Sequence, residues 1–254
     1  MIDLHSHLLP AIDDGSRSVK QSLRVLSLFT EQGIKGVALT PHVRASDMAL
    51  DPEDPIEQRA MAFAELRNGS AIELALYLGF EIMMDEPLPD RAFEDTAFAL
   101  GDSSYFLIEF PLAVDGSVVT DMVEHIVEKG GRPLIAHAER YYECGTEAVA
   151  EWRRAGAVVQ VDATTLTQPS SRGHRARQLL GLGLADIIAA DNHGNRRSLL
   201  TGIEYLSERG GADQATLLAT VNPGAIVNDQ STTPVPPLVI RESIVERLKR
   251  LKNG

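Results

Sequence analysis

The segment MIDLHSHLLPAIDDGS, residues 1–16, opens with a short apolar run that ends in His5 and His7. In an extended chain, residues i and i+2 point to the same side, so the two imidazoles face one point. Asp13, Asp14 and a glycine follow shortly afterwards. Residues of these types pack a core poorly. The segment therefore predicts a first β-strand that ends in candidate functional residues.

Six further short apolar runs follow, most of them rich in β-branched residues. They are GVALT (36–40), ELALYLGFE (73–81), YFLIEF (105–110), PLIAH (133–137), AVVQVD (157–162) and DIIAAD (186–191). Helical patterns lie between them or after them, at 18–32, 55–67, 117–129, 146–155 and 241–254. Alternating strands and helices predict an α/β fold with a parallel sheet. Seven strands without a switch point predict a closed or nearly closed barrel, and we expect one domain over residues 1–254.

Composition excludes several classes of protein. The formal net charge of -12 argues against a nucleic-acid-binding surface, which needs clustered Lys and Arg. The single cysteine, Cys144, allows no internal disulfide and favours the reducing cytoplasm. Asp3 and His5 interrupt the start of the chain before an apolar segment forms, so we expect no signal peptide. No apolar run is long enough to cross a membrane, and we expect no membrane insertion.

The ends of the predicted strands share one kind of chemistry. In a parallel barrel the carboxyl ends of all strands meet at one rim. Six of the seven strand ends supply histidines or carboxylates, namely His5 and His7, His42, Glu81, Glu109, His137, and Asp191 with His193. A single such residue is often only a helix cap or incidental. Together with Asp14, however, the set has too many ligands for one ion, which indicates two or three ions. Imidazole and carboxylate suit Mn, Fe and Zn.

Several motifs of this chain resemble one bacterial family. MIDLHSHLLPAIDDGS, ALTPH, GFEI, LIEF, IAHAERY and AADNH are similar to the CpsB/YwqE-type tyrosine-protein phosphatases of the PHP (polymerase and histidinol phosphatase) superfamily. The resemblance covers nearly the whole chain, in order. It implies a PHP-type distorted (β/α)7 barrel in which two or three metal ions, usually Mn2+, are bound. It also implies hydrolysis of phosphotyrosine on the tail of a bacterial tyrosine kinase that controls capsule and exopolysaccharide synthesis.

The resemblance also implies roles for individual residues. The metal ligands would be His5, His7, Asp14, His42, Glu81, Glu109, His137, Asp191 and His193. The catalytic candidates are Arg140, Asp14 and His42. Of these, Arg140 can form a bidentate fork on a phosphate beside the metal site. Arg140, Arg44 and Arg196 are the candidate substrate contacts. Val43-Arg44 after His42 and the loop GNRRSL after His193 depart from the family pattern.

Other functions compete with this interpretation. The same site would suit a phosphoesterase for a small phosphate monoester such as histidinol phosphate, or a non-catalytic metal-binding scaffold. An amidohydrolase-type enzyme shares the barrel and the His-x-His motif, but the lysine that usually bridges its metals is missing from the strand ends. Cys144 lacks the phosphate-binding loop of a cysteine phosphatase, so we expect it to be a bystander. The sequence is compatible with a monomer or an oligomer.

Overall fold

The computed structural model describes residues 1–69, 73–94, 96–143 and 145–238. Cys144 and the expected helix at 241–254 lie outside these residues. The strands are β1 Ile2–Asp3, β2 Gly36–Leu39, β3 His42–Arg44, β4 Ala75–Leu78, β5 Glu81–Met83, β6 Tyr105–Glu109, β7 Arg132–Ile135, β8 Val158–Asp162 and β9 Ile187–Ala189. The helices are α1 Val19–Glu31, α2 Ala45–Leu50, α3 Glu53–Gly69, α4 Gly116–Glu128, α5 Thr146–Arg154, α6 Ser171–Gly181, α7 Leu199–Ser207, α8 Ala212–Thr216 and α9 Asn222–Val227.

Two of the seven expected strands are each broken into two pieces. β2 continues into β3 after Thr40 and Pro41, and β4 continues into β5 after Gly79 and Phe80. The order β1-β2-β4 therefore passes into the order β3-β5-β6-β7-β8-β9, with every pairing parallel. Hydrogen bonds cross the breaks, since the amide of Glu81 donates to the carbonyl of Pro41 at 3.0 Å. The distorted seven-stranded barrel expected from the sequence is confirmed.

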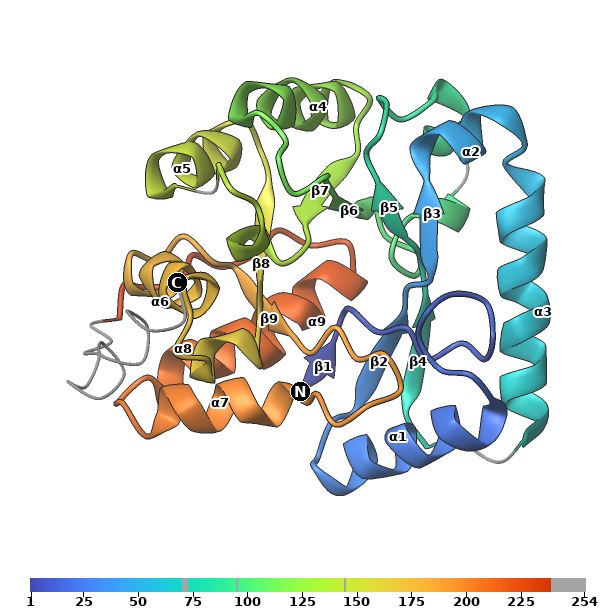
Figure 1. Cartoon of the computed structure of the whole chain (residues 1–254), viewed down its shortest axis with the longest axis horizontal. Coiled ribbons are helices and arrows are strands. Elements are labelled where there is room, and N and C mark those ends of the chain that lie inside the picture. The colour runs from blue at the N-terminus through green and yellow to red at the C-terminus, as the bar shows by residue number, and fades with distance from the viewer. Residues whose placement is uncertain (70–72, 95, 144, 239–254) are drawn as a thin grey trace.

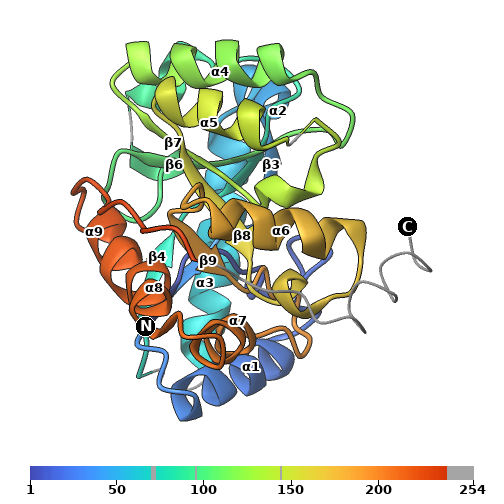
Figure 2. The same cartoon turned by 90° about the vertical axis from the view of Figure 1, so that its left-hand side faces the viewer.

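The barrel closes where the segments that follow its first and last strands meet. Just past β1, Ser6 forms a parallel bridge with Asn192, which follows β9. The helices lie outside the strands, with α4 and α5 over β6–β8 and α1 and α7 on the opposite side (Figures 1 and 2). Most of the strands are buried on both faces, as in other parallel sheets covered by helices, whereas β3 and β4 are partly exposed.

Local sequence explains the helix boundaries. Ser18 caps α1 through its side chain, which accepts a hydrogen bond from the amide of Gln21, and Gly33 follows the helix with φ +80°. Asp115 caps α4 in the same way. The buried faces of these helices, which include Phe29 and Val123, join one large core cluster. None of the described helices is long and apolar enough to cross a lipid bilayer.

Candidate metal centre

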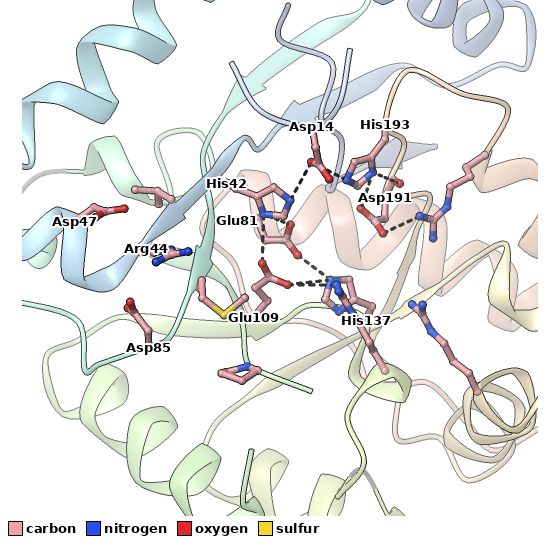
Figure 3. Close-up of a pocket in the computed structure, with 16 residues that line it drawn as sticks. Asp14, His42, Arg44, Asp47, Glu81, Asp85, Glu109, His137, Asp191 and His193 are labelled. Atoms are coloured by element: carbon pink, nitrogen blue, oxygen red, sulfur yellow. Dashed lines mark hydrogen bonds and ion pairs between the residues drawn. The ribbon is translucent and has the colours of Figure 1, made fainter. Parts of the chain in front are cut away.

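The carboxyl ends of the strands surround a cavity of about 930 Å3 (Figure 3). The structure brings all nine predicted ligands together: seven of them line this cavity, and the buried His5 and His7 lie behind its lining. The nine are His5, His7, Asp14, His42, Glu81, Glu109, His137, Asp191 and His193, and each lies within 3.5 Å of another member of the set. Strands that are far apart in the chain supply these side chains, so only the closed barrel makes them neighbours.

The deepest group consists of His5, His7, Glu81 and Asp191. Nε2 of His5 lies 3.2 Å from Nε2 of His7, 3.1 Å from Oε2 of Glu81 and 3.4 Å from Oδ1 of Asp191. Nε2 of His7 lies 3.2 Å from the same Glu81 oxygen and 3.5 Å from the same Asp191 oxygen. Ligands about 2.0–2.2 Å from one ion are separated by roughly 2.9–3.5 Å. The four donor atoms therefore fit a single divalent cation.

A second group adjoins the first through Glu81. Nδ1 of His42 lies 3.1 Å from Oε2 of Glu81 and 3.3 Å from Oε1 of Glu109. His137 lies beside this group, with Nε2 2.8 Å from Oε1 of Glu81 and 3.8 Å from Oε2 of Glu109. Oε2 of Glu81 therefore faces His5, His7 and His42, whereas Oε1 faces His137, so Glu81 would help to hold ions in both groups.

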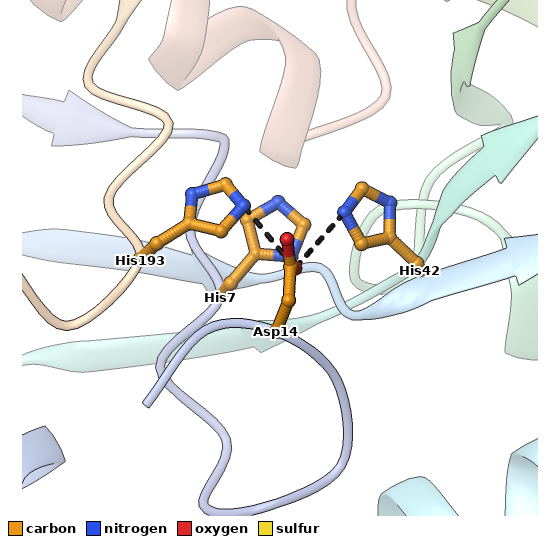
Figure 4. Close-up of side chains that lie close together, drawn as sticks. All are labelled: His7, Asp14, His42 and His193. Carbon is orange, nitrogen blue, oxygen red and sulfur yellow. Dashed lines mark ion pairs between the residues drawn. The ribbon is translucent and has the colours of Figure 1, made fainter. Parts of the chain in front are cut away.

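A third group lies at the mouth of the cavity and contains His7, Asp14, His42 and His193. Figure 4 shows the Asp14 carboxylate between two imidazoles, and its Oδ1 atom lies 3.4 Å from Nε2 of both His42 and His193. The Asp14 side chain is 74% exposed, whereas the deepest group is buried. This group therefore has direct access to molecules entering from solvent.

Two residues that sequence reasoning did not assign hold the first two histidines in place. Oδ2 of Asp13 lies 2.7 Å from Nδ1 of His7, and the Gln160 side chain lies 3.0–3.2 Å from Nδ1 of His5. Such partners fix the ring and leave the other nitrogen for a metal. Burial disfavours charge on His7, but hydrogen bonds to Asp13, Asp191 and Glu81 outweigh burial and raise the pKa of His7 well above its usual value.

Gly15 explains why the DDG sequence can reach the site. A Cβ atom at Gly15 would lie 2.2 Å from the His7 carbonyl oxygen and 2.4 Å from its Cβ. Only glycine lets the loop pass this close to His7. The close approach places Asp13 against the imidazole, with a hydrogen bond from the Gly15 amide to Asp13 at 2.9 Å. The sequence offered a signal for this role, namely two adjacent aspartates before a glycine.

Two candidate ligands have unusual backbone conformations. His137 has φ +32° and Asp191 has φ +48°, in the region that non-glycine residues rarely adopt. Backbone strain of this kind gathers at functional sites, where the surrounding structure maintains it. Each residue lies two positions after the end of a strand, β7 or β9, and its side chain belongs to the cluster.

Three arginines border the cavity near the cluster: Arg140, Arg172 and Arg197. Nη1 of Arg140 lies 3.4 Å from Oε2 of Glu109, and Nη1 of Arg197 lies 2.9 Å from Oδ2 of Asp191. Arg44 borders the cavity at its other end, beside Asp47 and Asp85 (Figure 3). Four cationic side chains are therefore available to an anion in this cavity.

The structure corrects one predicted substrate contact. Arg196 does not line the cavity; it borders a separate hollow with Gln21 and Arg24. Arg197 takes the place that was expected for Arg196, and Arg172 had not been assigned. The two adjacent arginines point to opposite sides of their loop, which the sequence could not reveal because the loop has no regular periodicity.

Buried carboxylates position these arginines. Asp162, the last residue of β8, is fully buried and pairs with Arg197 and, at 3.5 Å, with Arg172. Glu139, also buried, lies 3.2 Å from Nη2 of Arg172. Burial raises the pKa of Glu139, although the charge of Arg172 opposes this effect. Asp162 therefore orients cations and does not face the cluster.

Comparison with known proteins agrees with this geometry. The family model described as capsular polysaccharide synthesis, CpsB/CapC, matches residues 1–228 of this chain. The matched region contains every residue of the cluster. The chain belongs to the CpsB/CapC family. The family resemblance noted from the sequence motifs is therefore confirmed.

Curated relatives of this CpsB/CapC chain match three quarters of its length or more. Tyrosine-protein phosphatase CpsB of Streptococcus pneumoniae is 29% identical over 243 residues, covering 91% of this chain and 99% of the relative. Tyrosine-protein phosphatase YwqE of Bacillus subtilis is 24% identical over 247 residues, covering 95% of this chain and 97% of the relative. The putative tyrosine-protein phosphatase CapC of Staphylococcus aureus is 27% identical over 200 residues, covering 76% and 77%.

Solved structures show the same barrel as this CpsB/CapC chain. A chain from the crystal structures of YwqE from Bacillus subtilis and CpsB from Streptococcus pneumoniae superposes with a TM-score of 0.80 at 23% identity, covering 95% of this chain and 100% of that one. Dihydropyrimidinase from Brevibacillus agri superposes with a TM-score of 0.53 at 9% identity, covering 94% and 73%. Among the described residues, no lysine lines the cavity, so a lysine bridge between metals is missing there.

Proposed function

We propose that this protein is a metal-dependent phosphatase that removes phosphate from phosphotyrosine side chains of proteins. The observation that carries the proposal is the set of three ligand groups, which share His7, His42 and Glu81. Shared ligands hold neighbouring ions close together, as hydrolysis at phosphorus requires. The curated relatives named tyrosine-protein phosphatases support the choice of substrate.

The donor set fits two or three divalent ions. Five imidazoles and four carboxylates converge on one rim, and the deepest four donor atoms have the separations that one ion needs. Imidazole and carboxylate together suit Mn2+, and also Fe or Zn. We assign His5, His7, Glu81 and Asp191 to the deepest ion, and Asp14, His42, Glu109, His137 and His193 to its neighbours. Bound ions would activate a water and offset the charge on the phosphate oxygens.

In addition to the ions, the arginines of the cavity supply positive charge that binds the phosphate of the substrate. A guanidinium binds two phosphate oxygens at once, with fixed geometry. Arg140 and Arg197 each lie next to a carboxylate of the cluster, so both can contact a phosphate held there. Asp14 and His42 lie at the mouth and meet the incoming phosphate first. Fixed donors of this kind favour the transition state, in which negative charge grows on oxygen.

The cavity also suits an aromatic phosphate ester. Val43, Met83 and Pro111 line the same cavity as the cluster and Arg44, and they give it apolar surface. A tyrosine ring can pack on these side chains while its phosphate contacts the cluster. The phenol group of tyrosine has a pKa of about 10, so it leaves with little assistance. We therefore propose that Arg44 contacts the part of the substrate polypeptide that surrounds the phosphotyrosine.

The biological partner that we propose is a bacterial tyrosine kinase of capsule or exopolysaccharide synthesis, whose phosphorylated tail enters the cavity in the cytoplasm. The family description links CpsB/CapC proteins to capsular polysaccharide synthesis, which supports this partner.

The proposal is tested with protein stripped of metal and reloaded with Mn2+. Phosphate release is measured from a phosphotyrosine peptide and, in parallel, from histidinol phosphate. We expect Mn2+-dependent release from the peptide, lost in His5→Ala and strongly reduced in Arg140→Ala. Arg154→Gln, at an exposed site on α5, serves as the control and should retain full activity. Preference for histidinol phosphate would contradict the proposed substrate, and no turnover of either compound with metal bound would contradict an enzymatic function.

A further inference from the structure

A second hollow lies behind the loop that carries the last two ligands. It has a volume of about 650 Å3 and is lined by one side of α1 and by Gly194, Asn195 and Arg196. Its charged lining residues are Lys20, Arg24 and Arg196, and none of its lining residues is acidic. We call this hollow the basic groove. Such a surface is notable in a chain with a net charge of -12.

The three cations of the basic groove are exposed and available to a ligand. Among the described residues, no carboxylate forms an ion pair with Lys20, Arg24 or Arg196. In contrast, Arg197 is held by Asp191 and Asp162. Arg197 is thus held in place by carboxylates, whereas its neighbour Arg196 has no ion pair among the described residues.

One loop forms the wall between the basic groove and the metal cavity. Asp191, His193 and Arg197 border the cavity, whereas Gly194, Asn195 and Arg196 border the groove. The loop is fixed to α1, because the side-chain amide of Gln21 donates a 2.8 Å hydrogen bond to the carbonyl of Gly194. A Cβ atom at Gly194 would lie 2.5 Å from Nε2 of Gln21, so glycine is needed for this contact. The groove therefore keeps a defined position beside the cluster.

We propose that the basic groove binds acidic side chains of the same polypeptide whose phosphotyrosine occupies the cavity. The inference rests on the proposed function and extends it to the sequence around the phosphotyrosine. Arg196 lies three positions after His193, so their Cα atoms are at most about 11 Å apart. An extended peptide covers this span with about three to four residues. The groove therefore selects substrates with Asp or Glu about three to five residues from the phosphotyrosine.

Charge complementarity identifies the occupant. Exposed ion pairs contribute modestly to affinity, and complementary charge mainly sets specificity and the rate of encounter. A phosphotyrosine peptide is already anionic, and most of the chain's surface charge is negative, so an acidic peptide is repelled elsewhere on the protein. The basic groove provides the local attraction that lets such a peptide approach the cavity.

The test uses Mn2+-loaded protein and phosphotyrosine peptides of equal length. One series carries Glu three to five residues before or after the phosphotyrosine, and the matched series carries Gln. We expect a lower KM for one Glu series. In Arg24→Gln/Arg196→Gln, that KM should rise about five- to tenfold, with kcat unchanged and no effect on Gln peptides or on a small aryl phosphate. The advantage of Glu should vanish at about 1 M salt.

A matched double variant, Arg67→Gln/Arg154→Gln, removes the same charge at exposed sites that border neither the cavity nor the basic groove. It should retain the preference for Glu. Equal KM values for Glu and Gln peptides, or a preference that survives in Arg24→Gln/Arg196→Gln, would overturn the inference. If no phosphotyrosine peptide is hydrolysed, the proposed function fails; the groove is then tested by anisotropy of a fluorescent, unphosphorylated acidic peptide, which must bind the wild type about fivefold more tightly than the groove variant.

Discussion

The backbone amide of His7 donates a 2.9 Å hydrogen bond to the carbonyl of Asn192. This bond joins the segment after the first strand to the segment after the last one, and it interlocks the His5-Ser6-His7 and Asp191-Asn192-His193 motifs. As a result, Nε2 of His5 and Oδ1 of Asp191 are 3.4 Å apart. The closure of the barrel and the deepest part of the metal centre are therefore one structural feature.

Glu81 is the ligand whose loss should affect the metal content most. Its Oε2 atom lies 3.1–3.2 Å from nitrogens of His5, His7 and His42, so it belongs to two ligand groups. We expect Glu81→Gln to lose at least one ion per chain, measured by elemental analysis after dialysis, together with nearly all phosphatase activity. Glu109→Gln, which belongs to one group, is the comparison and should lose less metal. Equal metal content in wild type and Glu81→Gln would contradict a bridging role.

Asp13 should act through His7 and not as a ligand. Its carboxylate lies 2.7 Å from Nδ1 of His7 and fixes the ring. Replacement of such a partner typically costs about 10- to 100-fold in metal affinity or activity. We expect Asp13→Asn to show this loss in a Mn2+ titration, with activity restored by excess Mn2+. A variant that stays inactive at saturating Mn2+ would instead place Asp13 in the chemical step.

Metal binding should weaken as the pH falls. Hydrogen bonds to carboxylates outweigh burial and raise the pKa of His7 well above its usual value. A raised pKa favours the protonated form of His7 in metal-stripped protein, and a Mn2+ ion bound to His7 must displace that proton. Affinity should fall about tenfold per pH unit for each proton displaced, and calorimetry in two buffers should detect proton release on binding. A Mn2+ affinity that does not change between about pH 6 and about pH 8 would contradict this coupling.

Adjacent arginines should differ sharply in their effect on a small substrate. Arg197 lies 2.9 Å from Asp191 and borders the cavity, whereas Arg196 does not. With a small aryl phosphate, we expect Arg197→Gln to reduce kcat/KM about 100-fold or more, since charged groups that stabilise a transition state are worth this much. Arg196→Gln should match the wild type with this substrate. A larger loss of kcat/KM in Arg196→Gln than in Arg197→Gln would instead support the substrate contact that the sequence predicted for Arg196.

Arg153 should stabilise the fold without contributing to the site. Its Nη2 atom lies 2.6 Å from Oδ1 of Asp186, and the other Asp186 oxygen accepts a 2.9 Å hydrogen bond from the amide of Val159. Removal of one partner leaves a buried charge, so Arg153→Met should lower the free energy of unfolding by about 3 kcal/mol in urea denaturation. The double variant Arg153→Met/Asp186→Leu should recover part of this loss. A strictly additive double variant would show that the pair is not coupled.

The sequence alone predicted the barrel and the residues that the candidate metal centre brings together. Alternation of strand and helix is a local pattern, and in a parallel barrel the residue that ends each strand must lie at one rim. Thus Glu109 and His137 could be placed from their positions in the chain, whereas His42 and Glu81 begin β3 and β5, just after the two breaks. The two broken strands were not foreseen, because Pro41 and Gly79 interrupt the pairing without interrupting the apolar pattern.

Only the tertiary structure decided how these residues are grouped and supported. Contacts between distant segments place Gln160 beside His5 and Asp162 beside Arg197, and no spacing in the sequence predicts such pairs. Loop side chains follow no period, so the orientation of Arg196 and Arg197 depended on the left-handed turn at Asp191 and on the bond from Gln21 to Gly194. Sequence periodicity fixes the side of a strand, whereas the direction of a loop residue is set by what the folded chain packs against it.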